Sequence, residues 1–387
     1  MDTKTKILEI LNCTDVKNSN ANVDEYSFGG RKFEAAGLML KEIAMEQFIK
    51  PEVAQAFKEN RIYIHDMDNY ATGMHNCLFV DFERLFKEGF TTRNGDVRPP
   101  KSISTAMQQV AVIFQCQSQV QFGGVASAHI DFDLAPFVGM SFVKHFKDGL
   151  KFLNKMSDEE IADVLNKYAI KMGDKNIATK YSEAYDYAYE LTERECLQAA
   201  QGLYHNLNTL ESRAGSQLPF TSINFGRDTS PEGRMVSKSL LLASIDGIGK
   251  FHKTSIFPIA IFQHKKGINA NPGDPNYDLK QLAIKSLCKR IYPNFVNCDF
   301  TGNEEDITNP DTYMATMGCR TMLGYDRHGF GYSKVGRGNV TPMTLNLPKI
   351  GIKHGICLGE RETADIDGFY NELDELLSLV ETGLVDR

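Results

Sequence analysis

Two cysteines and an asparagine are residues whose types and spacing could support sulfur chemistry. Cys319 lies in Met317-Gly318-Cys319-Arg320, Asn339 follows twenty residues later, and Cys77 lies far upstream in His75-Asn76-Cys77-Leu78. Glycines flank the downstream cysteine, and glycine adopts backbone angles that are denied to other residues. Such a loop can place a sulfur atom at an exposed apex within a larger fold. The pattern therefore predicts a loop that presents sulfur to a substrate.

The stretch 314–338 is rich in glycine and poor in hydrophobic runs, so we expect a long loop, the cysteine loop, over residues 314–339. Long ordered loops inside compact domains usually have a function. The alternative is a surface loop without a function, in which Cys319 is an inert, small hydrophobic residue.

Composition limits the class of protein. The 387 residues are 42% hydrophobic, which suffices for one large or two ordinary domains. No apolar run is long enough to cross a membrane and the N-terminus has no secretory signal, so we expect a cytoplasmic protein. The eight cysteines form no CxxC pair and are expected to be reduced thiols. The net charge of −7, with both signs interspersed, argues against a nucleic-acid partner.

The hydrophobic pattern indicates a mixed α/β chain. Helical spacing is seen over residues 33–49, 103–121, 134–152 and about 158–210. From residue 220 the period changes, and the predicted elements are a strand at 220–225, a helix at 232–244, strands at 256–262 and 294–298 around a helix at 279–290, a strand at 340–347 and a helix at 366–380. This alternation predicts a barrel or a wound sheet.

Several separate motifs, taken in order, resemble the anaerobic (class III) ribonucleoside-triphosphate reductases, which are glycyl-radical enzymes. The matching segments are Asn18-Ser19-Asn20-Ala21-Asn22-Val23-Asp24-Glu25, Tyr63-Ile64-His65-Asp66-Met67-Asp68, Asn76-Cys77, Gln121-Phe122-Gly123-Gly124, Asp274-Pro275-Asn276-Tyr277-Asp278, Met317-Gly318-Cys319-Arg320 and Leu345-Asn346-Leu347-Pro348. The resemblance implies a helical N-terminal region followed by the first part of a ten-stranded glycyl-radical-enzyme α/β barrel with a cysteine finger loop. The expected divisions are an N-terminal extension (1–17), a helical region with a dimer and effector face (18–215), and an incomplete barrel (216–387).

The same resemblance implies roles for three residues. Cys319 matches the cysteine that becomes a thiyl radical and removes the 3′-hydrogen of the substrate ribose. Cys77 matches the thiol on the opposite face of the ribose that takes part in reduction. Asn339 matches the asparagine of members that use formate as reductant, and an amide can donate and accept hydrogen bonds without titrating. A dithiol reductant is the alternative to formate.

Three further residues on the matching segments are weaker candidates for substrate contact. They are His65, Asn76 and Met317. The histidine could equally be a core residue whose ring is satisfied by a neighbouring carboxylate, and the methionine could merely fill space.

The resemblance also implies deoxynucleotide effectors bound at a homodimer interface. Lys101 and Lys144 lie at matching places, and lysine supplies a point charge for phosphates. Both could instead be ordinary solvated lysines. The sequence contains no GxxxxGK[ST] phosphate loop, so nucleotide binding is implied by the resemblance alone.

The sequence departs from the family pattern in two ways that affect which function we expect. Only about seventeen residues precede the first match, so no ATP-cone domain is expected. The segments that carry the radical glycine and the four-cysteine zinc site in complete members have no counterpart up to Arg387, and no metal ligands are assigned in this chain. The leading hypothesis is an N-terminal part of a reductase that needs a C-terminal reductase fragment and a radical-SAM activating protein.

Two alternatives stay open. The chain could be a catalytically inactive fragment or module that binds nucleotide effectors. It could also be another glycyl-radical enzyme, such as a pyruvate formate-lyase relative, although those proteins carry two adjacent cysteines on the loop and Cys319 stands alone.

Overall fold

The structure is a computed structural model that describes residues 2–12, 26–73, 75–300, 302, 304–318 and 321–387. Its centre is a sheet with the strand order β8-β7-β6-β5-β2-β9. The first five run parallel to their neighbours, whereas β9 is antiparallel to β2. Along the chain these strands are β2 (Cys77–Phe79), β5 (Val125–Ser127), β6 (Thr221–Phe225), β7 (Ile259–His264), β8 (Asn294–Asn297) and β9 (Gly338–Asn339).

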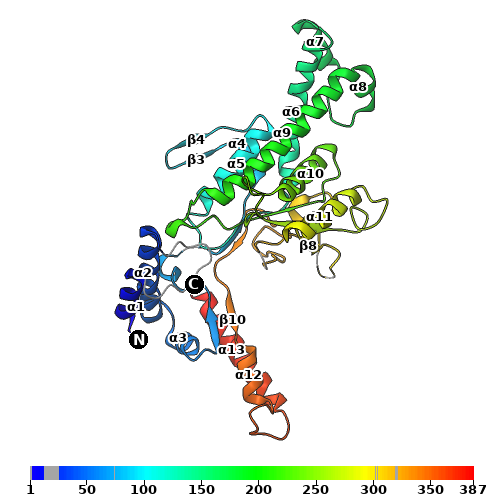
Figure 1. Cartoon of the computed structure of the whole chain (residues 1–387). Coiled ribbons are helices and arrows are strands. Elements are labelled where there is room, and N and C mark those ends of the chain that lie inside the picture. Colours follow the sequence, from blue (N-terminus) through cyan, green and yellow to red (C-terminus); the bar gives the residue numbers. More distant parts are fainter. Residues whose placement is uncertain (1, 13–25, 74, 301, 303, 319–320) are drawn as a thin grey trace.

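Long helices connect the parallel strands and cover the outer face of the sheet (Figure 1). They are α5 (Ile103–Gln117), α6 (Ile130–Phe152), α9 (Ser182–Thr209), α10 (Pro231–Asp246) and α11 (Tyr277–Arg290). Parallel strands need such crossover connections, and strands covered on both faces are expected to be buried throughout. Strand β6 is accordingly buried along its whole length. Helices α6 and α9 pack side by side and extend beyond the sheet to α7 (Asp158–Lys167) and α8 (Lys175–Lys180).

Alternation along β6 separates two environments. Ile223 and Phe225 belong to the large apolar core beneath the helices. Ser222 and Asn224 are also fully buried, but successive side chains of a strand point to opposite faces, so these two polar residues face the interior of the barrel. The inner face of the sheet is therefore partly polar, which matters for the cysteine loop.

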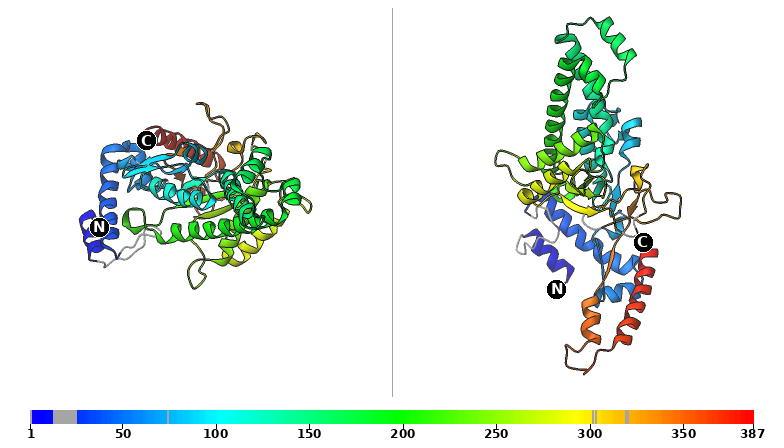
Figure 2. Two further views of the ribbon diagram at one scale, coloured as in Figure 1. Left: turned by 90° about the horizontal axis from the view of Figure 1, so that it is seen from above. Right: turned by 90° about the vertical axis from the view of Figure 1, so that its right-hand side faces the viewer.

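A second unit joins the two ends of the chain. Its N-terminal elements are α1 (Thr3–Leu11), α2 (Phe28–Ile43), a π-helical turn (Ala44–Phe48), α3 (Pro51–Lys58) and β1 (Ile62–Ile64). Strand β1 pairs antiparallel with β10 (Met343–Leu345), which leads into α12 (Leu347–His354) and α13 (Ile366–Val385). Val53, Ile62 and Ile64 share an apolar cluster with Ile350 and Leu376, so segments near the two ends of the chain are packed together, as Figure 2 shows.

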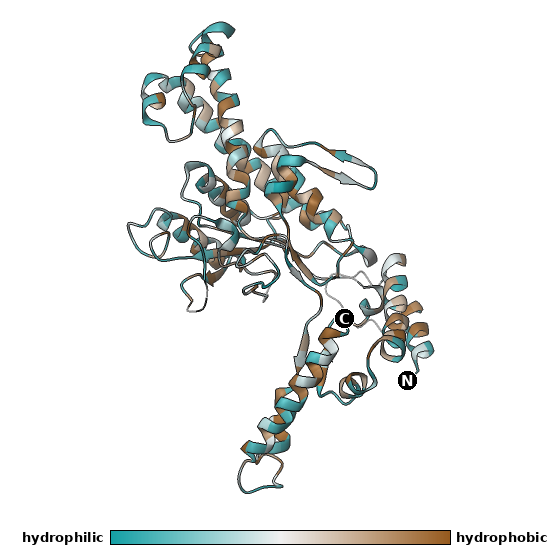
Figure 3. Cartoon of the chain, turned by 180° about the vertical axis from the view of Figure 1, so that it is seen from behind, coloured by the Kyte–Doolittle hydropathy of each residue, from teal (hydrophilic) through white to brown (hydrophobic). Residues whose placement is uncertain are grey.

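The remaining elements are short. They are α4 (Phe82–Glu88), the hairpin β3 (Phe90–Thr92)–β4 (Gly95–Val97), and 3₁₀ turns at Tyr70–Thr72, Ala214–Ser216 and Pro310–Thr312. Figure 3 shows brown, apolar strands at the centre and mostly teal, hydrophilic ribbon around α7 and α8. In the described part of the chain, no helix combines the length and the apolar character that a membrane crossing requires.

The predicted helices and strands after residue 216 occur in the predicted order, with β9 and α12 as additional elements, and the α/β class is confirmed, but the extent of one strand was wrong. The helical region predicted over about 158–210 is confirmed and consists of three helices, with a left-handed glycine, Gly173 (φ 80°), between α7 and α8. The strand predicted over 340–347 is limited to β10, because Asn346 caps a new helix by accepting a hydrogen bond from Lys349 N. The central sheet draws β2 and β5 from before residue 216 as well as β6 to β9 from after it.

Candidate functional site

The pairing of β2 with β9 places Cys77 directly opposite Asn339. Asn339 Oδ1 accepts a hydrogen bond of 2.9 Å from Cys77 N, and its carbonyl accepts one of 3.1 Å from Asn76 N. A β-carbon on Gly338 would lie 2.3 Å from the Cys77 carbonyl oxygen, so the close approach of the two strands requires glycine there. Two predicted site residues that are far apart in sequence are thus locked in register.

The thiol of Cys77 is held on two sides. Its Sγ donates to Asn76 Oδ1 at 3.0 Å and accepts from Gly124 N at 3.2 Å. Asn76 in turn donates through Nδ2 to Asp66 Oδ2 at 2.8 Å. At Gly123 a β-carbon would meet Asn76 Oδ1 at 2.1 Å, which explains why glycine occupies this place in the turn. The sulfur therefore has a defined orientation beside the turn.

A cavity of about 400 Å³ opens beside this pair. Its wall combines apolar and aromatic side chains with a few polar groups, as is typical of small-molecule sites. The lining residues are Asp66, Asn76, Cys77, Phe122, Gly123, Gly124, Phe220, Thr221, Phe257, Ile259, Met317, Gly318, Thr321 and Asn339. Asn76, Cys77, Asn339 and Met317, all singled out from the sequence, therefore share one cavity.

The predicted radical cysteine, Cys319, lies outside the described residues, as does the segment 18–25. Gly318, directly before it, and Thr321, two positions after it, line the cavity. Met317 N donates to Thr321 O at 2.8 Å. Met317 is only 1% exposed and packs in an inner cluster with Phe79, so it both fills space and forms part of the wall.

The other predicted residues lie elsewhere. His65 is not among the residues that line the cavity: its Nε2 lies 2.8 Å from Thr344 Oγ1 and its ring packs edge-on against Tyr63. Lys101 and Lys144 are exposed on the helical region. The start of α5 is joined to α6 by a hydrogen bond from Ile103 N to Ser141 Oγ at 3.0 Å, so both lysines lie near one helix junction.

Two residues of the site carried no signal in the sequence. Thr221, at the start of β6, lines the cavity, and its buried Oγ1 has no hydrogen-bond partner among the described residues. Arg213 is 8% exposed, and its guanidinium lies 4.6 Å from the ring centre of Phe220, a wall residue. Burial lowers the pKa of Arg213 to about 10, although the charges of Asp66 and Asp68 oppose this. The Arg213 guanidinium therefore places a positive charge behind the aromatic side chains that line the cavity.

The described residues thus form a mostly parallel α/β sheet with an inner cavity lined by Cys77 and by Gly318 and Thr321 of the cysteine loop, as expected for the first part of a barrel. Residues 19–387 match the family model described as "Anaerobic ribonucleoside-triphosphate reductase". The chain belongs to this family.

Relatives agree with that assignment. The chain is 34% identical over 377 residues to the anaerobic ribonucleoside-triphosphate reductase of Haemophilus influenzae, covering 96% of this chain and 47% of that protein. It is 32% identical over 362 residues to the enzyme of the same name from Enterobacteria phage T4, covering 93% of this chain and 54% of that protein. The chain thus spans about half the length of these relatives.

Solved structures share the fold. The anaerobic ribonucleotide reductase from Thermotoga maritima with glycerol in the active site superposes with a TM-score of 0.62 at 16% identity, covering 99% of this chain and 56% of that one. The same enzyme in complex with dATP and CTP gives a TM-score of 0.57 at 15% identity, with coverages of 98% and 56%. At this identity the likeness supports the barrel fold alone.

Proposed function

We propose that this chain reduces ribonucleoside triphosphates to deoxyribonucleoside triphosphates by a thiyl-radical mechanism under anaerobic conditions, acting together with a segment that carries a radical glycine. The observation that supports this most is the single cavity that joins Cys77 and Asn339 to Gly318 and Thr321, which precede and follow Cys319 in the loop. A glycyl radical, formed by a radical-SAM activating protein, would supply the unpaired electron that the chemistry needs.

Each polar wall residue has a role in this proposal. Cys319 removes the 3′-hydrogen atom of the ribose and later returns it. The 2′-hydroxyl takes up a proton and leaves as water, and Cys77 gives a hydrogen atom to the 2′-carbon from the opposite side. Formate would return a hydrogen atom to Cys77 and pass its remaining electron to the substrate as it becomes CO₂. Thr221 Oγ1, buried and without a partner among the described residues, is suited to hold a ribose hydroxyl. Formate is the favoured reductant: Asn339 Oδ1 already accepts from Cys77 N, so its Nδ2 group is the donor left for a small carboxylate.

The proposal is tested by an anaerobic assay. The chain is combined with the glycyl-radical segment, the activating protein, formate and a ribonucleoside triphosphate, and deoxyribonucleoside triphosphate is measured by chromatography. Product that depends on this chain and on formate is expected. A stable radical signal with no product from any of the four ribonucleotides would contradict the proposal.

The Cys77→Ser variant separates two steps. Because the hydroxyl keeps the size of the thiol but is a far poorer hydrogen donor to a radical, we expect product to fall by at least about 100-fold. The first hydrogen abstraction should persist, visible as a substrate-dependent loss of the radical signal in electron paramagnetic resonance. Cys116→Ser, at an exposed position on α5, serves as the matched control and should leave the yield unchanged. A normal yield from Cys77→Ser would remove Cys77 from the mechanism.

Effector binding is the second proposed function, and the helix junction near Lys101 and Lys144 favours it. Removing the phosphate-facing charge in Lys144→Ala should weaken deoxynucleotide binding about 10-fold, as expected for one charge-assisted contact. Lys147→Ala, an exposed lysine on the same helix, is the control. Isothermal titration with dATP measures both variants, and equal affinities would take Lys144 out of the effector site.

A further inference from the structure

The segment 314–318, here called the loop arm, crosses the inner face of the sheet and leads directly to Cys319. Every second residue of the arm forms a backbone hydrogen bond with a side chain of β6 or β7. The bonds are Gln263 Nε2 to Met314 O (2.7 Å), Asn224 Nδ2 to Thr316 O (3.0 Å), Thr316 N to Asn224 Oδ1 (3.1 Å) and Gly318 N to Ser222 Oγ (3.0 Å).

The two residues between these bonded positions, Ala315 and Met317, are apolar, and their side chains point away from the bonded side chains of β6 and β7. Ala315 and Met317 are each 1% exposed and pack in the inner cluster with Phe79, Ala126 and Ala128 of the neighbouring strands. The arm therefore alternates in the manner of a strand, with its backbone bound by polar side chains and its own side chains in an apolar layer.

These polar side chains are buried, and the two amides are also fixed by contacts outside the arm. Ser222, Asn224 and Gln263 have no exposed surface. Asn224 Nδ2 also donates to Ser127 O at 2.8 Å, and Gln263 Nε2 to Ala128 O at 3.3 Å, so both amides are anchored to the end of β5. A one-residue slip of the arm would present apolar side chains to the amides and leave buried backbone groups without partners, which is costly.

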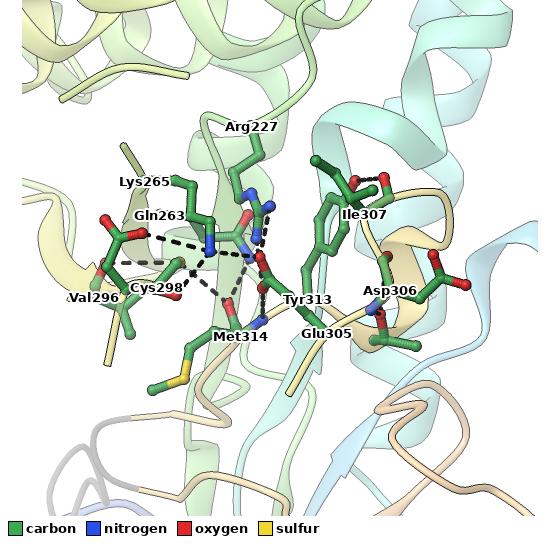
Figure 4. A network of polar contacts seen from close by, with 12 residues as sticks. Arg227, Gln263, Lys265, Val296, Cys298, Glu305, Asp306, Ile307, Tyr313 and Met314 are labelled. Carbon is green, nitrogen blue, oxygen red and sulfur yellow. Dashed lines mark hydrogen bonds and ion pairs between the residues drawn. The ribbon is translucent and has the colours of Figure 1, made fainter. Parts of the chain in front are cut away.

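The outer end of the arm is held by charge. Figure 4 shows Arg227 and Lys265 converging on Glu305, whose Oε2 lies 3.5 Å from Met314 N. Arg227 Nη1 and Lys265 Nζ each lie 2.8 Å from this carboxylate. The register of the arm is therefore defined from residue 314 to residue 318.

We propose that Ser222, Asn224 and Gln263 are positioning residues that set the register of the loop arm and thereby the place at which Cys319 meets the substrate. This inference rests on the proposed function for the role of Cys319. Its consequence is large because a reacting group misplaced by about 1 Å can cost about 100-fold in rate. None of the three needs to touch the substrate to have this effect.

The test is the reactivity of Cys319 in the intact 387-residue chain, measured as the rate of alkylation by iodoacetamide with peptide mass spectrometry. Exposed Cys116 in the same sample is the internal reference. Ser222→Ala, which removes a single hydroxyl, should speed alkylation of Cys319 about five-fold relative to Cys116, the factor that the loss of one such hydrogen bond gives. Asn224→Ala removes three bonds and should have a larger effect.

Asn276→Ala is the matched control. Asn276 is equally buried and donates to two carbonyls, Gly226 O and Asp228 O, but does not bond the arm. We expect it to lower the melting temperature without changing the relative rate at Cys319. Unchanged Cys319 rates in both arm variants, or an equal rise in the control, would overturn the proposal. Alkylation requires no radical, so a chain that forms no deoxynucleotide still tests the arm.

Discussion

Replacing Cys319 by alanine should abolish deoxyribonucleotide formation in the assembled enzyme. Alanine has no S–H bond, so no sulfur radical can form at this position and no 3′-hydrogen can be taken from the ribose. We expect product to fall by at least about 1000-fold, because a residue that reacts directly cannot be replaced by the remaining binding interactions. Turnover is measured anaerobically with each ribonucleoside triphosphate and with the glycyl-radical signal quantified beforehand.

The control for this variant is effector binding. Lys101 and Lys144 lie on the helical region, away from the lining of the cavity, so Cys319→Ala should bind deoxynucleotides with unchanged affinity. Cys357→Ala, which removes an exposed thiol after α12, should leave turnover intact. Retained turnover in Cys319→Ala would exclude it as the radical cysteine, and loss of effector affinity would show that the variant had misfolded.

The sequence predicted which residues belong to the site better than it predicted how they lie relative to one another in the cavity. Cys77 and Asn339 were recognisable because their positions match those of the reductase family. Their direct pairing was not predictable from spacing, because 262 positions separate them and the contact depends on two strands of two or three residues. Strands this short have too few alternating positions to show a period.

Residues that depend on tertiary context escaped prediction. Arg213 and Thr221 lie near the boundary between the helical region and β6, where no motif distinguishes them, and only the folded cavity brings them to the site. His65 shows the converse: its motif suggested substrate contact, but the structure places its ring against Tyr63 and Thr344, outside the cavity lining. The proposed role for His65 therefore has no support from the geometry.

The polar inner face of the sheet was also hidden in the sequence. Ser222 and Asn224 lie in a segment that was correctly predicted as a strand, and alternation gave their common face. Nothing in that segment indicated what they would bind. Their partners come from a stretch almost one hundred residues later with no regular pattern, so the loop arm became visible only when both were in place.

The second large effect is expected at Glu305, the carboxylate that joins the arm to the sheet. Arg227 and Glu305 retain only 2% and 9% of their side-chain surface, and Lys265 forms a second ion pair with the same carboxylate. Glu305→Gln would remove the counter-charge of Arg227 and leave Lys265 with only the more distant Asp299, 3.5 Å away. Loss of one partner from a buried pair typically costs about 3–5 kcal/mol, and we expect a decrease of that size in the free energy of unfolding.

The pH dependence of the free energy of unfolding provides a second, independent test of this prediction. Burial alone would raise the pKa of Glu305, but hydrogen bonds and positive charge from Arg227 and Lys265 outweigh it and lower the pKa from 4.5 to about 2. A carboxylate whose pKa is lower in the folded state stabilises the protein above its unfolded pKa and loses that contribution as the pH falls through the folded value. The difference in stability between the original chain and Glu305→Gln should therefore be full above pH 4.5 and shrink towards pH 2.

Urea unfolding of both chains between pH 7 and pH 3 measures this difference. Glu304→Gln is the matched control, since the neighbouring glutamate is exposed and bonds only Tyr332 among the described residues; it should change stability by no more than about 0.5 kcal/mol. Equal stabilities of the two glutamine variants at pH 7 would show that the charge cluster does not hold the arm. A large loss that does not shrink on acidification would assign the effect to packing, since only the ionic contribution disappears when the carboxylate is protonated.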